Sequence, residues 1–239
     1  MESTAPLASS VSVAYLQGLL DYLDRQGFAS SDLLAKVQLS PSLLGQRDQR
    51  VAASAYLELL AEGVRLTGAE QLGLHLGEAI RPGYYGVLGY LIMSCATLSD
   101  ALHRQARYAS LVGNLGRVEL DEEPPREGLE PQVVHSWHPS LPQHQRLHAE
   151  ETLAGWVTFG HWISGLTVPP TEVRFQYPAP ADTSEYQRIF RCPVLFDQAD
   201  NALVFPKRLL ATPLGQADAQ LRQLLDAHAD RLLGELRQG

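Results

Sequence analysis

Apolar residues recur at three- and four-residue spacing along the first quarter of the chain, which is the period of amphipathic helices. The clearest stretch covers 13–26, where Ser10 or Ser12 can cap the start and Gly27 can end the helix. Further helices are predicted over 31–37, from 40–41 onward, over 53–67 and over 70–80. The first quarter therefore predicts a cluster of helices.

The next segment is almost free of charge. An apolar run from Tyr84 to Met93 follows the break at 81–83, and it predicts a buried helix. Thr97 is a candidate N-cap for another helix, with Asp100 three residues later in place of the usual Glu or Gln. That helix is expected to end near Gly113.

Beyond Leu115 the pattern changes to a period of two, which is typical of strands. Strands are predicted over 115–120 and 132–138, and the second one places Val133, His135 and Trp137 on one face. Six carboxylates lie between Glu119 and Glu130 around two prolines, and they indicate a solvated turn. Further strand signals cover 172–177, 193–196 and 202–205, and the last two are joined by a turn over 197–201.

Helical spacing returns in the second half of the chain. A long helix is predicted over 142–164, short ones over 182–190 and from Pro206, and a last one over 216–237. The last helix can dock on its own domain, meet a partner helix or lead into a further domain. For a dimer contact the candidates are the leucines along one side, Leu221, Leu225, Leu232 and Leu236.

These elements predict an α+β fold. We expect an N-terminal helical cluster packed with a small, mostly antiparallel sheet and a long helix, followed by a C-terminal linker or dimerisation helix. The expected division is a sensing unit over 1–214 and a terminal helix over 215–239.

Bulk composition excludes several classes of protein. With 45% hydrophobic and 19% charged residues the chain is an ordinary globular protein. A net charge of −8 argues against a nucleic-acid-binding surface, which needs clustered Lys and Arg. No signal peptide or membrane-spanning run is recognisable, and the two cysteines lack ligand spacing, so we expect a cytoplasmic protein.

Catalytic and cofactor signatures are missing. Dinucleotide, phosphate-loop, zincin and esterase motifs do not occur, and we expect neither an enzyme nor a cofactor. His144, His148 and Glu151 share one face of a predicted helix and could offer three metal ligands. Such pairs are common by chance and usually solvated, so no metal is expected, and a small metal-assisted enzyme stays as an alternative.

The aromatic residues suggest a binding site. They fall on elements that should face one another, and polar histidines are interleaved among them, as expected of a pocket for a small, mainly apolar ligand. Core packing alone can explain each of these residues, but it does not explain why they occur together with the histidines. The candidate ligand-binding residues are Tyr84, Tyr85, Tyr108, His135, Trp137, Trp156, Phe159 and His161, with Trp162 nearby in the sequence.

Two longer patterns resemble a known family. One is the run from Gly86 through Thr97, Ala101 and Tyr108. The other is Tyr186–Asp197 with its phenylalanines and Cys192–Pro193, continued by Asn201–Pro206 and Leu209–Leu214. Both are similar in order and spacing to the N-terminal domain named arabinose-binding in one branch of AraC-type transcription regulators. The resemblance covers nearly the whole chain.

The resemblance implies a function. Domains of this kind bind a small-molecule effector, dimerise, or both, and they precede helix-turn-helix units that contact DNA. We therefore expect an effector of unknown identity, a homodimer, and DNA contact only through a part beyond Gly239. The sugar-binding arm of AraC itself has an all-β pattern, which this helix-rich chain does not share, and a ligand-free dimerisation module stays as an alternative.

Overall fold

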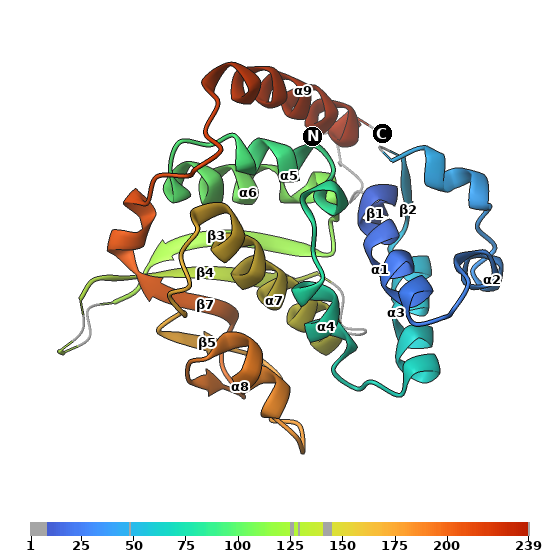
Figure 1. Ribbon diagram of the computed structural model, residues 1–239, viewed down its shortest axis with the longest axis horizontal. Coiled ribbons are helices and arrows are strands. Elements are labelled where there is room, and N and C mark those ends of the chain that lie inside the picture. Colours follow the sequence, from blue (N-terminus) through green and yellow to red (C-terminus); the bar gives the residue numbers. More distant parts are fainter. Residues whose placement is uncertain (1–8, 48, 125–126, 129, 141–144, 239) are drawn as a thin grey trace, which may run out of the picture.

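The computed structural model describes residues 9–47, 49–124, 127–128, 130–140 and 145–238, and these form the α+β fold that the pattern predicts (Figure 1). The helical cluster comes first. Its elements are β1 (Ser10–Ser12), α1 (Val13–Arg25), α2 (Ser30–Lys36), the 3-10 turn η1 (Pro41–Gly45), β2 (Arg50–Ala52) and α3 (Ala53–Thr67). Ser12 is the cap of α1, because its hydroxyl accepts the Tyr15 N–H at 3.2 Å.

Residues 72–112 fold differently from the pattern at one point. The elements are α4 (Leu72–Glu78), the 3-10 turn η2 (Pro82–Tyr85), α5 (Val87–Met93) and α6 (Leu98–Val112). A single buried helix over 84–93 is wrong, because Gly86 has φ 58° and ψ −138° and separates η2 from α5. The side chain of Tyr90 is also half exposed. The Thr97 cap is confirmed, since its hydroxyl accepts the Asp100 N–H.

The main sheet has the order β3-β4-β7-β5-β6. Its strands are β3 (Gly116–Glu122), β4 (Gln132–Pro139), β5 (Glu172–Arg174), β6 (Val194–Leu195) and β7 (Asn201–Pro206). All neighbours are antiparallel except β5 and β6, so the mostly antiparallel sheet is confirmed. The turn over 197–201 does not make a hairpin, because β5 lies between β6 and β7.

The described carboxylates around the turn between β3 and β4 are mostly exposed, as predicted, and Glu123 is the most buried of them. Arg174 of β5 forms an ion pair with Glu123 at 2.8 Å, and both side chains are largely buried. Glu122 pairs with Lys207, and Glu130 pairs with Arg208. These charges therefore tie the end of the β3–β4 hairpin to the strand and turn beside it.

Helix α7 (Gln145–Ser164) lies across one face of the sheet, with α8 (Ser184–Phe190) at its N-terminal end (Figure 1). Helix α4 packs directly on α7. A Cβ at Gly73 would overlap the Leu147 carbonyl oxygen, and one at Gly77 would lie 2.6 Å from the Glu151 carbonyl oxygen. Only glycine allows this contact, so the sequence of α4 fixes the position of α7.

The last helix, α9 (Ala219–Gln238), follows the 3-10 turn η3 (Lys207–Ala211) and docks on α5 and α6 (Figure 1). Leu225, Leu232 and Leu236 pack into the small core that α5 and α6 share with α9. Leu221 is 45% exposed and its neighbour Leu224 is 71% exposed. Among the described residues, no helix is long and apolar enough to cross a bilayer.

Candidate ligand-binding pocket

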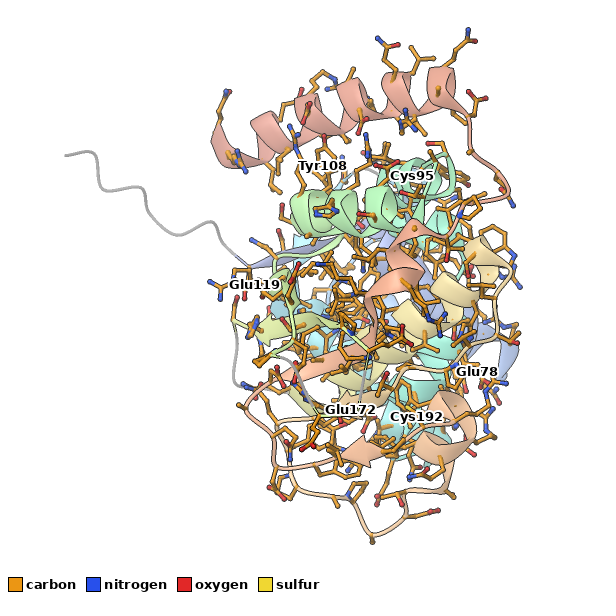
Figure 2. The ribbon with its side chains drawn as sticks, turned by 90° about the vertical axis from the view of Figure 1, so that its left-hand side faces the viewer. Glu78, Cys95, Tyr108, Glu119, Glu172 and Cys192 are labelled. Carbon is orange, nitrogen blue, oxygen red and sulfur yellow. The ribbon has the colours of Figure 1, made fainter. Side chains whose placement is uncertain are left out.

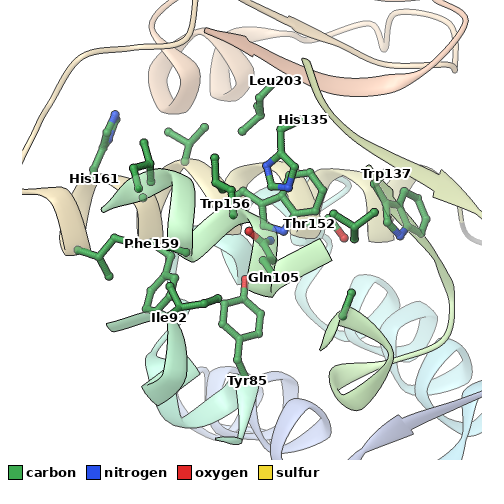
Figure 3. A pocket seen from close by; sticks show the side chains of 18 of the residues that line it. Tyr85, Ile92, Gln105, His135, Trp137, Thr152, Trp156, Phe159, His161 and Leu203 are labelled. Carbon is green, nitrogen blue, oxygen red and sulfur yellow. The ribbon is translucent and has the colours of Figure 1, made fainter. Parts of the chain in front are cut away.

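A cavity of about 170 Å³ lies between the sheet, α7 and the α5–α6 pair. Strands β3, β4 and β7 form one wall, α7 a second, and α5 with α6 a third (Figure 3). None of the described residues that line it is Asp, Glu, Lys or Arg. The lining is therefore apolar with a few neutral polar groups, as in sites for small organic ligands.

Six of the eight predicted binding residues line this cavity: Tyr85, His135, Trp137, Trp156, Phe159 and His161. The structure places the other two elsewhere. The Tyr84 hydroxyl donates to Asp21 of α1 at 2.8 Å, and the Tyr108 hydroxyl donates to Asp230 of α9 at 2.7 Å (Figure 2). Trp162 is 49% exposed and stacks on Phe159.

His135 enters the cavity from the middle of β4, where it is paired with Leu120 on one side and Leu203 on the other. Its ring stacks on Trp156 with centroids 3.8 Å apart. Its Nε2 is buried and has no hydrogen-bond partner among the described residues. Burial disfavours the imidazolium and lowers the pKa of His135 to about 3, so the ring is neutral at physiological pH.

A hydrogen-bonded cluster lies beside the cavity. The Tyr56 hydroxyl donates to Glu151 at 2.6 Å, and His148 Nδ1 lies 3.1 Å from the same carboxylate oxygen. Burial, together with the charge of Glu151, raises the pKa values of Tyr15 and Tyr56 well above their usual range. The expectation of a solvated histidine face is wrong for His148, because this end of α7 is buried against α1 and α3.

The cluster explains His148 and Glu151 without a metal. His144, the third candidate ligand, lies outside the described residues. Within the part of the chain that is described, His, Cys, Asp and Glu side chains form no group that could hold an ion.

Six polar or aromatic lining residues were not predicted as ligand contacts from the sequence: Tyr15, Gln105, His148, Thr152, Ser164 and Phe205. A signal for Gln105 exists in the sequence. On α6 it stands in a stripe of otherwise apolar positions at helical spacing, and the whole stripe, Leu98, Ala101, Leu102, Gln105, Ala109 and Val112, faces the cavity. A polar residue inside a buried stripe is a candidate contact for a ligand.

The end of α7 and the segment that follows it form another part of the lining. Leu166, Val168 and Pro170 belong to the lining. His161 Nε2 lies 2.9 Å from the Val168 carbonyl oxygen. Because a carbonyl only accepts, His161 carries its proton on Nε2 and donates it to this contact.

Helix α6 also holds α9 on the side away from the cavity. The Arg104 guanidinium pairs with Asp226 at 2.9 Å, and Arg107 pairs with Asp230 at 2.7 Å. Tyr108 donates to the same Asp230 and lies between the two helices (Figure 2). Residues that touch α9 therefore alternate along α6 with residues that line the cavity.

Comparison with known proteins identifies the family. Residues 27–214 match the model described as the arabinose-binding domain of AraC transcription regulator, N-term. The ornithine utilization regulator of Pseudomonas aeruginosa is 27% identical over 229 residues, which are 96% of this chain and 66% of that protein. A helix-turn-helix-type transcriptional regulator of Mycobacterium tuberculosis is 25% identical over 92% of this chain and 65% of its own length.

Among solved structures, the transcriptional regulator CdpR from Pseudomonas aeruginosa matches with a TM-score of 0.57 and 20% identity, over 85% of this chain and 64% of that one. This likeness supports the fold. The chain spans just under two thirds of the length of these regulators. The relatives are regulators rather than enzymes, and with the family model covering most of its length, this chain belongs to the N-terminal regulatory domains of AraC-type transcription regulators.

Proposed function

We propose that this domain senses a small, largely apolar organic effector in the cavity and passes the occupancy of the cavity to α9. The observation that carries the proposal is the double contact of α6. One face of this helix lines the cavity, and the other binds α9 through Arg104, Arg107 and Tyr108.

The mechanism follows from that arrangement. A ligand that enters the cavity contacts Gln105 and Ala109, and these alternate along α6 with Arg104 and Tyr108. A ligand shifts an equilibrium only through its different affinities for the two states. A small displacement of α6 on binding changes the free energy of the α6–α9 contacts, and α9 then takes up a different position or a different degree of order.

Helix α9 is the connection to the rest of the regulator in this proposal, with 1–214 as the sensing unit and 215–239 as the linker. The helix-turn-helix part of a longer protein would follow α9. Its position relative to a second copy would set the spacing of two DNA-binding parts.

Ornithine itself fits the cavity poorly, although one relative is a regulator of ornithine utilization. It carries ammonium and carboxylate groups, whose burial is costly without an opposite charge. The described lining residues supply no such charge. A ligand with a mainly apolar body is therefore the better candidate.

A second role, homodimerisation through α9, has its own observation. Leu221 and Leu224 lie one turn apart and are exposed, whereas Leu225, Leu232 and Leu236 are occupied by the contacts with α5 and α6. The dimer contact is then proposed for the exposed pair. Sedimentation of Leu224→Asp against the unchanged chain tests it, and a chain that is monomeric at high concentration contradicts it.

The sensing proposal is tested by ligand screening followed by hydrogen exchange. Amino acids, fatty acids and neutral aromatic compounds are screened for a rise in Tm, and each stabilising compound is then tested for its effect on amide exchange over 219–238. We expect binding to change this exchange. If no compound raises the Tm, the sensing role is wrong.

The route through α6 is tested with two variants of the same chemistry. Arg104→Gln removes an ion pair between α6 and α9, and Arg231→Gln removes one within α9, with Glu235. Both variants are expected to keep ligand binding. Only Arg104→Gln should reduce the exchange response of α9, and an equal response in both variants contradicts the route.

A further inference from the structure

The cavity contains hydrogen-bonding groups that the protein itself does not use. The Gln105 amide, the Thr152 hydroxyl and the Tyr85 hydroxyl come from α6, α7 and η2, and their side chains point toward the same part of the cavity (Figure 3). Among the described residues, none of the three side chains has a hydrogen-bond partner. All three residues are partly accessible rather than fully buried, so their side-chain groups can bind the polar part of a ligand.

The neighbouring polar groups are already committed. Tyr56 and His148 both contact the Glu151 carboxylate, which is not itself part of the lining. The nearby His135 Nε2, which is buried and has no partner among the described residues, extends the region around Gln105 toward β4.

Charge limits what this region can accept. The described lining has no cation to receive an anion, and no carboxylate to receive an ammonium group. Burial, with the nearby charge of Glu151, raises the pKa of the Tyr85 hydroxyl, which keeps it a neutral donor. The same negative field opposes a carboxylate on the ligand.

The remaining lining sets the shape of the ligand. Ile92, Phe159 and Ile163 supply apolar surface next to the stacked His135–Trp156 pair. The volume, about 170 Å³, is close to that of apolar cavities that take up benzene, on the order of 150 Å³. The space therefore suits one ring or a short branched chain with a small head group.

We propose that the effector is an uncharged compound with an apolar body of about this size and a single neutral head, an amide, hydroxyl or carbonyl group, which Gln105, Thr152 and Tyr85 hold by hydrogen bonds. This inference rests on the proposed sensing function and narrows it to one ligand class. A sugar does not belong to that class, because most of its hydroxyls would face apolar side chains.

The test uses ligands of one size that differ in the head group. Calorimetry at pH 7.5 compares benzamide and benzyl alcohol with benzoate, benzylamine, toluene and arabinose on the whole 239-residue chain. We expect the two neutral heads to bind at least about tenfold more tightly than the charged compounds, toluene and arabinose, because each hydrogen bond to an otherwise unpaired group contributes about that factor.

Two variants test which side chains bind the polar head group of the ligand. Gln105→Leu and Thr152→Val remove hydrogen bonds with little change of volume, and each should weaken benzamide binding about fivefold to tenfold while toluene binding stays the same. The exposed Gln187→Leu is the matched control and should change neither affinity. The Tm of each variant is measured first, and Thr152→Val, the closest in shape, serves if Gln105→Leu does not fold.

The outcomes separate the two proposals. Benzoate, benzylamine or arabinose binding as tightly as benzamide overturns the neutral-head class, and so does toluene binding equal to benzamide, while the sensing function stands in each case. Failure of every compound in this series to bind overturns the neutral-head class. Only failure of the wider screen as well removes the sensing function.

Discussion

The two sides of α7 are built in opposite ways. Toward α4 the helices touch through Gly73 and Gly77, with no space for even one added carbon. Toward the sheet and α6 the same helix faces a cavity of about 170 Å³ with unpaired polar groups. Native interiors are usually close-packed, so an open space beside so tight a contact indicates a site kept open for a ligand. The contact with α4 fixes the position of α7, and the opposite side of α7 lines the cavity.

The largest effect is expected on the tight side. Gly73→Ala places a methyl group on the Leu147 carbonyl oxygen and should cost more than about 3 kcal/mol of unfolding free energy, measured by urea denaturation. Gly160→Ala on α7 is the control, because an added Cβ there meets nothing within 4 Å. It should leave stability unchanged or raise it by up to about 1 kcal/mol. Equal losses of unfolding free energy in the two variants would contradict the contrast between the two sides of α7.

The next effect depends on pH and concerns the cavity side. The pKa of His135 is lowered to about 3 in the folded protein, against about 6.5 unfolded. Below pH 6.5 the unfolded chain binds a proton that the folded one refuses, so this contribution to stability is present above pH 6.5 and is lost as the pH falls. From pH 7 to 5 the loss is about 2 kcal/mol.

His135→Phe isolates that contribution. The variant keeps an aromatic ring against Trp156 but cannot titrate, so its unfolding free energy should fall by about 2 kcal/mol less than that of the unchanged chain between pH 7 and pH 5. Denaturant titrations at several pH values measure the difference. Parallel pH profiles would mean that His135 is protonated as easily in the folded state as in the unfolded one.

The smallest change in stability is expected from filling the cavity. Ala109→Leu adds three carbons on the α6 side, where there is space, and should alter the unfolding free energy by no more than about 1 kcal/mol. This variant should also lose the binding of benzamide, which calorimetry measures. A loss of stability as large as that of Gly73→Ala would show that the cavity is less open than described.

The sequence predicted the elements well where a local signal decides them. The caps at Ser12 and Thr97 are set by side chains within three residues, and the pattern alone found both. Gly86 was missed because an apolar run looks the same whether or not a glycine inside it takes up a positive φ. The order of β5, β6 and β7 depends on pairing between distant segments, for which spacing carries no information.

The residues of the candidate site were likewise predicted correctly only where a local pattern decides which way a side chain points. Period two placed His135 and Trp137 on the inner face of β4, which the structure confirms. Tyr84 and Tyr85 are adjacent on one 3-10 turn and point to different neighbours, so no periodicity could choose between them. Tyr108 was assigned to the cavity, although it belongs to the other face of α6, because the docking of α9 on that face was left open.

The contact between His161 and Val168 bears on how quickly such a sensor responds. Two described hydrogen bonds join α7 to the segment that follows it: His161 Nε2 with the Val168 carbonyl oxygen at 2.9 Å, and the Leu166 N–H with the Ser164 hydroxyl at 3.2 Å. Local opening of these contacts needs less free energy than global unfolding, so a ligand can exchange faster than the domain unfolds. In the sensing function proposed above, the occupancy of the cavity would then follow the concentration of the ligand without waiting for the domain to unfold.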